Sequence, residues 1–309
     1  MPALLSLRRL SYAVAQIPQN LAAPALDRVR EKRGIYGIDG DAGMAVHILD
    51  AVFRPVPGGA SVIRDARCLE LGPGRTPNVA IALALLGARD VSSIDVRSPP
   101  ELTPAAVDDT LAALRAGGSA ARLREGASLT ADDLTSRAER VRSGELPVTF
   151  GQYDGARLAA PEGRYDLAIS KSVLEHVAAD SVAPLLADLF RVSAPGALMS
   201  HWIDFRDHMR IVSDSETKGD WLDALAYPEW LYRLMYSKRI VAVNRLRHRE
   251  WRSAFAAAGF ESVADDVMEA DLPAGFTPER LDARWRAMPR DEFRRSQAIM
   301  VLRRAAPAG

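Results

Sequence analysis

The stretch CLELGPGRTPNVAIALALLGA, residues 68–88, contains a short apolar run, a glycine turn and an apolar helix in direct succession. The run at 67–72 is mainly apolar and closes with glycine, which is typical of a strand buried within a parallel sheet. Thr76 is predicted to be the N-cap of the helix and Pro77 its first residue. Gly87 is predicted to end it. The stretch therefore predicts one strand, turn and helix of an α/β fold.

The same alternation continues along the rest of the chain. Strand-like segments rich in apolar residues recur between helix-like segments, and such alternation predicts one open, mostly parallel sheet with helices on both faces. We therefore expect a seven-stranded α/β fold. The predicted strands are 67–72, 91–96, 147–155, 165–170, 196–205, 260–267 and 296–304.

Segments 98–147 and 206–247 interrupt this alternation of strands and helices, and they suggest how the domain is organised. Residues 1–60 are predicted to form an N-terminal helical cap, and 61–309 the main domain with a helical insertion at 98–147. Segment 206–247 is aromatic-rich, and aromatic side chains can line a pocket, form a subunit interface or pack onto the domain. We interpret it as a lid over the substrate. Its aromatic residues include Trp221, Tyr227, Trp230, Tyr232 and Tyr236.

Composition excludes several classes of function. The 40 basic and 40 acidic residues give a net charge of zero with no long basic tract, so we expect no nucleic-acid partner. The single cysteine, Cys68, excludes an internal disulfide and a cysteine-cluster zinc site. The apolar run at 79–86 is too short to span a bilayer. Arg8 and Arg9 interrupt the N-terminal apolar run, so we expect no secretory signal and a cytoplasmic protein.

The glycine turn predicts a ligand at the carboxyl edge of the sheet. Gly72 and Gly74 remove two Cβ atoms where open α/β sheets bind ligands. Asp95 ends the next predicted strand, where a carboxylate can accept hydrogen bonds from a ribose diol. Pro77 occupies the position of the third glycine of a dinucleotide fingerprint, and it removes an N–H that a pyrophosphate would use. A nucleoside-bearing ligand other than NAD or FAD therefore fits better.

Glu70 narrows the choice, because a carboxylate at the mouth of the turn repels a pyrophosphate and suits a cationic ligand. S-adenosylmethionine carries both a sulfonium and an ammonium group. The segment LELGPGRTP, with Glu70, Gly72 and Gly74, resembles the first motif of class I S-adenosylmethionine-dependent methyltransferases, in particular a "type 11"-like subset. Thr76 departs from the pattern, because many members carry a third glycine there.

Later segments extend the resemblance and imply further cofactor contacts. The resemblance implies that Asp95 binds the ribose hydroxyls and that Asp154, followed by Gly155, meets the adenine amino group. The segment YDLAISKSVLEHV, residues 165–177, is similar to the fourth strand and its loop, with Ser170 at the strand end facing the cofactor. The implied fold is Rossmann-like. The implied activity is methyl transfer from S-adenosylmethionine to an oxygen or nitrogen of a small molecule.

Three histidines are candidates for a catalytic base at the acceptor side: His176, His201 and His208. A positioned imidazole accelerates proton transfer from a hydroxyl by about 10²–10⁴-fold. A structural histidine remains an alternative for each of them. The cluster of histidines and aspartates at 201–208 is not cleanly spaced for metal ligands, so we expect no metal.

Two other classes of function remain open. One is a non-catalytic protein that binds S-adenosylmethionine or S-adenosylhomocysteine. The other is a nicotinamide-dependent oxidoreductase on a related sheet, against which Pro77 and Glu70 argue.

Overall fold

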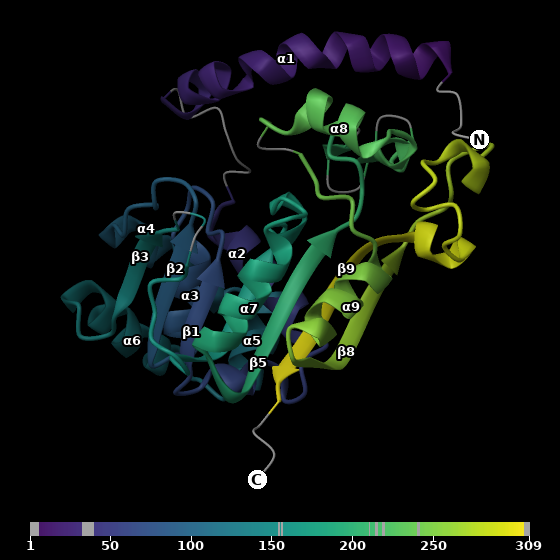
Figure 1. Cartoon of the computed structure of the whole chain (residues 1–309). Helices are drawn as coiled ribbons and strands as arrows, with labels where there is room; N and C mark the ends of the chain where they lie inside the picture. The colour runs from purple at the N-terminus through teal and green to yellow at the C-terminus, as the bar shows by residue number, and fades with distance from the viewer. Residues whose placement is uncertain are drawn as a thin grey trace.

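A computed structural model describes residues 6–32, 40–153, 155, 157–209, 211–213, 216–217, 220–239 and 242–305. Its main sheet has seven strands in the order β3-β2-β1-β4-β5-β9-β8, with five parallel strands and an antiparallel pair at one side (Figure 1). This confirms the predicted open, mostly parallel sheet. The strands are β1 (Arg67–Leu71), β2 (Asp90–Asp95), β3 (Val148–Gln152), β4 (Tyr165–Lys171), β5 (Ser193–Asp204), β8 (Phe260–Glu269) and β9 (Arg295–Arg304).

Helices cover both faces of the sheet, and each face has its own apolar core. One core joins the sheet to α2 (Ala42–Phe53), α3 (Asn78–Leu85), α4 (Pro104–Arg115), α5 (Ser119–Ala127) and α6 (Ala131–Ser143). The other joins the opposite face to α7 (Val182–Val192) and α9 (His248–Ala257). Burial of these apolar surfaces is the main stabilising contribution to such a layered fold. Short 3₁₀ helices are η1 (Gly59–Ile63), η2 (Leu174–His176), η3 (Asp223–Ala226), η4 (Pro278–Arg280) and η5 (Arg290–Phe293).

Threonine caps begin α4 and α6, whereas α3 begins without one. Thr103 Oγ1 accepts a hydrogen bond from Ala106 N at 3.2 Å and caps α4. Thr130 caps α6 within a reciprocal capping box. The predicted Thr76 cap on α3 is wrong, because Pro77 occupies the N-cap position with φ −81° and no side-chain cap. The glycine turn therefore extends through Thr76 before the helix begins.

A further layer lies beyond the carboxyl ends of the parallel strands, where α1 (Leu7–Lys32) runs across α8 (Glu229–Tyr236) (Figure 1). Ala13 of α1 packs into a small core with tyrosines of the 220–239 segment. Arg9 Nε donates to Asp223 Oδ1 at 2.8 Å and reinforces this contact. None of the described helices is long and apolar enough to cross a bilayer. A small separate sheet pairs β6 (Ile211–Ser213) with β7 (Glu216–Thr217).

The aromatic-rich segment packs onto the protein through most of its rings. Tyr227, Tyr232 and Tyr236 are buried against α1, and Trp221 is buried in a second small core with Phe276 and Trp285. Of the five aromatic residues, Trp230 alone is largely exposed, at 65%. These side chains therefore hold α1 and the segment together and do not form an open pocket wall.

Candidate functional site

The turn after β1 requires glycine at two positions, for two different reasons. Gly72 has φ +72°, and a Cβ there would lie 2.3 Å from Val173 Cγ2, because the loop after β4 passes directly over it. Gly74 has φ +67°, and a Cβ there would meet nothing within 4 Å. Gly72 thus permits close packing of the protein onto itself, whereas Gly74 faces open space. That space is where a ligand can approach the backbone.

Asp95 is held against this turn. It ends β2, the strand paired with β1, and its side chain is partly exposed. Its Oδ2 accepts a hydrogen bond from Gly74 N at 3.3 Å, and its Oδ1 accepts one from Arg97 N at 2.9 Å. The carboxylate is therefore fixed beside the open part of the turn. Each oxygen keeps a lone pair for the hydroxyls of a ribose.

Glu70 lies elsewhere than the sequence suggests. Its side chain is 4% exposed, and its Oε2 accepts a hydrogen bond from Ser93 Oγ at 2.6 Å. Burial, opposed by this hydrogen bond and assisted by the nearby charge of Asp95, raises the pKa of Glu70 to about 7. The expected exposed position at the mouth of the turn is corrected: the carboxyl group is buried beside Ser93, its register partner on β2.

Ser170 and His201 form a buried pair across β4 and β5. Ser170 Oγ and His201 Nδ1 are 2.8 Å apart, and the two residues are 3% and 0% exposed. The His201 ring stacks on Phe255 with centroids 5.8 Å apart. Burial lowers the pKa of His201 to about 4. This environment favours the structural alternative for His201, since a catalytic base must reach its substrate.

The two residues expected to meet adenine lie at the edge of what the structure describes. Gly155 is exposed with φ +86°, a backbone conformation that favours glycine. Asp154 lies outside the described residues.

The other two candidate histidines meet at the carboxyl ends of β4 and β5. His176 ends η2, His208 follows β5, and their ring centroids are 4.8 Å apart. Glu175 joins them, and the potential ligand atoms of the three side chains lie within 4.8 Å of one another. Glu175 is not among the site residues predicted from the sequence. Its position next to His176 in the LEHV segment was the available signal, but its inward orientation was not visible in the sequence.

Asp204 and Glu175 set the charge of this cluster. Burial opposes ionisation of Asp204, but His208 and the Arg206 guanidinium, 2.6 Å away, bring the pKa of Asp204 to about 2. Glu175 is 2% exposed, and burial raises its pKa to about 7. Its Oε1 accepts a hydrogen bond from Asp204 N at 3.2 Å. One carboxylate is therefore firmly ionised beside one that readily takes up a proton.

The pKa values of His176 and His208 are shifted in opposite directions. Burial and the neighbouring His208 lower the pKa of His176 to about 4. Burial also opposes charging of His208, but Asp204, with Oδ2 3.7 Å from His208 Nε2, and nearby Glu175 and Asp207 outweigh it and raise its pKa. His176 Nδ1 lies 2.9 Å from the Ala242 carbonyl oxygen, which can only accept, so Nδ1 carries the proton. Its Nε2 then carries a lone pair that can accept a hydrogen bond or a proton.

The turn and the cluster are two parts of one site. Val173, which packs over Gly72, precedes Glu175 by two residues along the same loop. The positive charge of Arg97, two residues after Asp95, contributes to the lowered pKa of His176. The loop after β4 therefore links the turn to the cluster.

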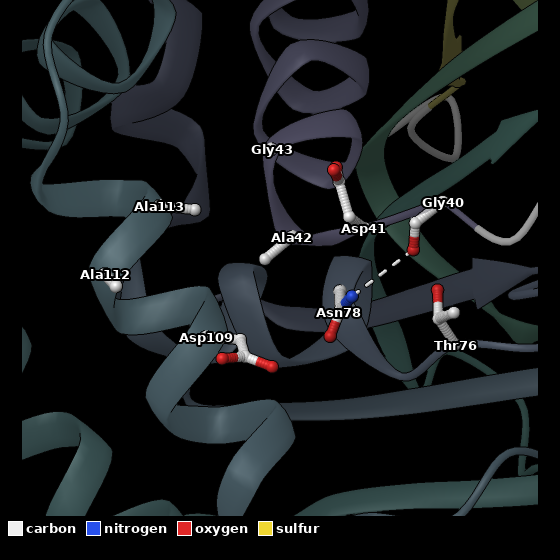
Figure 2. A pocket seen from close by; sticks show the side chains of 9 residues that line it. All are labelled: Gly40, Asp41, Ala42, Gly43, Thr76, Asn78, Asp109, Ala112 and Ala113. Carbon is white, nitrogen blue, oxygen red and sulfur yellow. Dashed lines mark hydrogen bonds between the residues drawn. The ribbon is translucent and has the colours of Figure 1, made fainter.

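A cavity of about 510 Å³ opens at the far end of the turn (Figure 2). Asn78 Nδ2 donates to Gly40 O at 3.4 Å across its wall, and Asp41 caps α2 beside it. The cavity touches the turn through Thr76 but includes neither Asp95 nor the histidine cluster. Its lining residues are Gly40, Asp41, Ala42, Gly43, Thr76, Asn78, Asp109, Ala112 and Ala113.

Comparison with protein families finds a match over most of the sheet. The family model described as "Methyltransferase domain" matches residues 60–265, more than half of the 309 residues. A comparison with curated proteins finds no match.

Solved structures with a similar fold share little sequence identity. An S-adenosylmethionine-dependent methyltransferase from Mesorhizobium loti is 17% identical, with 87% of this chain and 100% of that chain covered and a TM-score of 0.46. For an S-adenosylmethionine-dependent methyltransferase from Listeria monocytogenes, described as putative, the identity is 16%, the coverage 85% and 98%, and the TM-score 0.45. The complex of the Haloferax volcanii Trm112 methyltransferase activator with a methyltransferase is also similar. There the identity is 17%, the alignment covers 93% of this chain and 97% of that chain, and the TM-score is 0.44.

Proposed function

The chain belongs to the class I S-adenosylmethionine-dependent methyltransferases, and on this premise we propose that it methylates an oxygen or nitrogen atom of a small molecule. S-adenosylmethionine is the cofactor of this family, and it supplies a methyl group activated by the sulfonium charge. The identity of the acceptor as a small molecule is our inference.

The observation that carries the cofactor assignment is the contact between Asp95 and the backbone of Gly74. The carboxylate is bonded to the backbone of Gly74, and the space above Gly74 is open. The diol of a ribose can donate two hydrogen bonds to the carboxylate, while its base and chain follow the turn. Gly155 and Asp154 remain the predicted adenine contacts. Glu70 acts from within the sheet, and its proximity to Asp95 favours a cation nearby.

The chemistry of the acceptor side supports a hydroxyl or amine acceptor. The enzyme's main task in methyl transfer is alignment, with reacting atoms within roughly 3–3.5 Å. His176, neutral with Nε2 available, is suited to accept a proton from a hydroxyl. His208, whose pKa is raised, is suited to hold a proton beside it. His201 fits the structural role better than the catalytic one.

The layer formed by α1 and α8 supports an acceptor of limited size. Asn244 N donates to Glu175 O at 2.7 Å, and Asn244 Nδ2 donates to Leu174 O and Val177 O at 2.9 and 3.0 Å. The end of the aromatic-rich segment is thus bonded to the loop that carries the cluster. We propose that this layer covers the acceptor site.

Isothermal titration calorimetry with S-adenosylmethionine tests the cofactor site directly. Asp95→Asn should weaken binding by about 10- to 100-fold, because hydrogen bonds to a charged group contribute about 1.5–3 kcal/mol. Asp266→Asn is the matched control, since Asp266 pairs with Arg54 at the surface, away from the turn. Unchanged affinity in Asp95→Asn would remove Asp95 from the site.

Two further measurements separate the alternative functions. A fluorescence titration with NADH should show no binding, and saturable binding would favour an oxidoreductase. Profiling of small-molecule acceptors with a labelled methyl donor should show turnover. Cofactor binding without turnover on any acceptor would favour a non-catalytic binding protein.

A further inference from the structure

The cluster of Glu175, His176 and His208 contains buried polar atoms that no hydrogen bond satisfies. Among the described residues, Glu175 Oε2 is buried without a hydrogen-bond partner, and buried His208 Nε2 has only the longer ion-pair contact of 3.7 Å to Asp204 Oδ2. Glu175 is 2% exposed, so water does not solvate its carboxylate freely. His176 Nδ1 donates to Ala242 O, which leaves Nε2 as an acceptor. A buried carboxylate oxygen without a partner, such as Glu175 Oε2, is unfavourable unless a cation or another group satisfies it.

The donor set matches a particular class of cation. Two imidazole nitrogens and one carboxylate oxygen are ligands of zinc, iron and related divalent transition metals. Magnesium and calcium prefer oxygen ligands, so this set disfavours them. The ligands come from η2, which follows β4, and from the segment that follows β5, and these two strands are adjacent and parallel.

The supporting contacts are those that orient metal ligands in proteins. An imidazole that binds a metal through one nitrogen usually donates from the other to a carbonyl or carboxylate. His176 makes this bond to Ala242 O. Glu175 Oε1 is held by Asp204 N, so the other oxygen, Oε2, faces the cluster without a partner.

The three ligand atoms must move closer together to bind one metal ion. The atoms lie within 4.8 Å of one another, whereas ligands around tetrahedral zinc are roughly 3.4 Å apart. Side-chain movements of about 1 Å close this difference.

We propose that Glu175, His176 and His208 bind one divalent transition-metal ion, with zinc as the representative. Three protein ligands leave at least one coordination position open, as in catalytic zinc sites. That position lies on the acceptor side of the glycine turn, so the ion binds an oxygen of the acceptor. This role, though not the binding itself, rests on the proposed methyl transfer. It narrows the acceptor to a molecule with a hydroxyl or carboxylate oxygen, and it makes the two imidazoles ligands instead of free bases.

Metal binding to the full-length, chelator-treated protein tests the proposal without any substrate. Zinc competition with a chromophoric chelator should show one tight site in the wild type. Glu175→Gln and His208→Ala should each weaken it by at least about tenfold, since loss of even an outer hydrogen-bond partner costs 10–100-fold. His47→Ala removes an exposed histidine on α2 and should leave the site intact. Equal affinity in all four proteins, or no tight binding in the wild type, would overturn the proposal.

Cobalt provides a second readout that needs no variant. One equivalent of Co²⁺ bound by the wild type should give the visible absorption of a low-coordinate site with nitrogen ligands, and zinc should abolish it. A spectrum indistinguishable from aqueous Co²⁺ would contradict the proposal. Calorimetry with S-adenosylmethionine on the same samples distinguishes the two claims: cofactor binding without a metal site refutes only the metal, and a metal site without cofactor binding refutes only the proposed function.

Discussion

The two halves of the site are built in different ways. The cofactor half is a single turn with two glycines, and the carboxylate that joins it from the adjacent strand, Asp95, is 21 positions from Gly74 along the chain. The acceptor half brings together side chains from two strand ends, more than 30 positions apart, and depends on burial for its chemistry. Backbone geometry therefore defines the first half, and side-chain environment defines the second.

The largest expected effect is a difference in stability between alanine substitutions of the two glycines of the turn. Gly72→Ala should lower the free energy of unfolding by about 3 kcal/mol, from the clash with Val173 and the positive φ together. Gly74→Ala should cost only about 1 kcal/mol, because the positive φ is its sole penalty. Chemical denaturation measures both.

Gly74→Ala, which has the smaller effect on stability, should have the larger direct effect on cofactor affinity. Gly74→Ala places a methyl group in the ligand's space, so calorimetry should show a large loss of S-adenosylmethionine binding in a protein that remains folded. Normal affinity in Gly74→Ala would show that the open space is not the cofactor site.

The next effect concerns the pH dependence contributed by Glu70. Its pKa is raised in the folded protein from 4.5 to about 7, so the folded state binds more protons than the unfolded state between these values. Stability therefore falls as the pH rises through this window, by about 3 kcal/mol from this group. In Glu70→Gln this contribution should be absent, and the variant should be more stable than the wild type at pH 8.

Urea denaturation at pH 5 and pH 8 measures this difference. Glu261→Gln, at an exposed position of β8, is the control and should follow the wild type. An identical pH dependence in Glu70→Gln and the wild type would mean that Glu70 is ionised when buried.

A smaller effect is expected at the buried pair of β4 and β5. Ser170→Ala leaves His201 Nδ1 without its partner and should cost about 1–2 kcal/mol of stability. Because the Ser170 side chain faces His201, affinity for S-adenosylmethionine should be unchanged. A tenfold loss of affinity at unchanged stability would instead make the hydroxyl a cofactor contact.

The smallest perturbation is a titration of the native histidines by NMR. His208 should titrate above its ordinary pKa of 6.5, while His176 and His201 should stay neutral down to about pH 4. A raised pKa of His208 stabilises the fold below pH 6.5, and this contribution disappears as the pH rises through the folded value. Titration of His176 near 6.5 would show that its ring is solvated and the cluster open.

The same contrast explains how far the sequence alone could lead. Glycine spacing, strand periodicity and Thr103 or Thr130 capping are local signals, and the sheet, the turn and Asp95 follow from them. Glu70 was misplaced because strand alternation does not tell which positions at a strand end are covered by a neighbour. Glu175 was missed for a related reason: its orientation depends on Asp204 N, which is 29 residues away.

Asn244 has a practical consequence for engineering this enzyme. Its backbone and amide groups make three hydrogen bonds to the loop 174–177 and, together with the contact of Ala242 O with His176, connect the aromatic-rich segment to the acceptor cluster. A chimaera that exchanges the 220–247 segment to change acceptor preference must keep an asparagine at this junction. Without it, the exchanged segment would lose its hydrogen bonds to the loop 174–177, and its position relative to Glu175 and His176 would no longer be fixed.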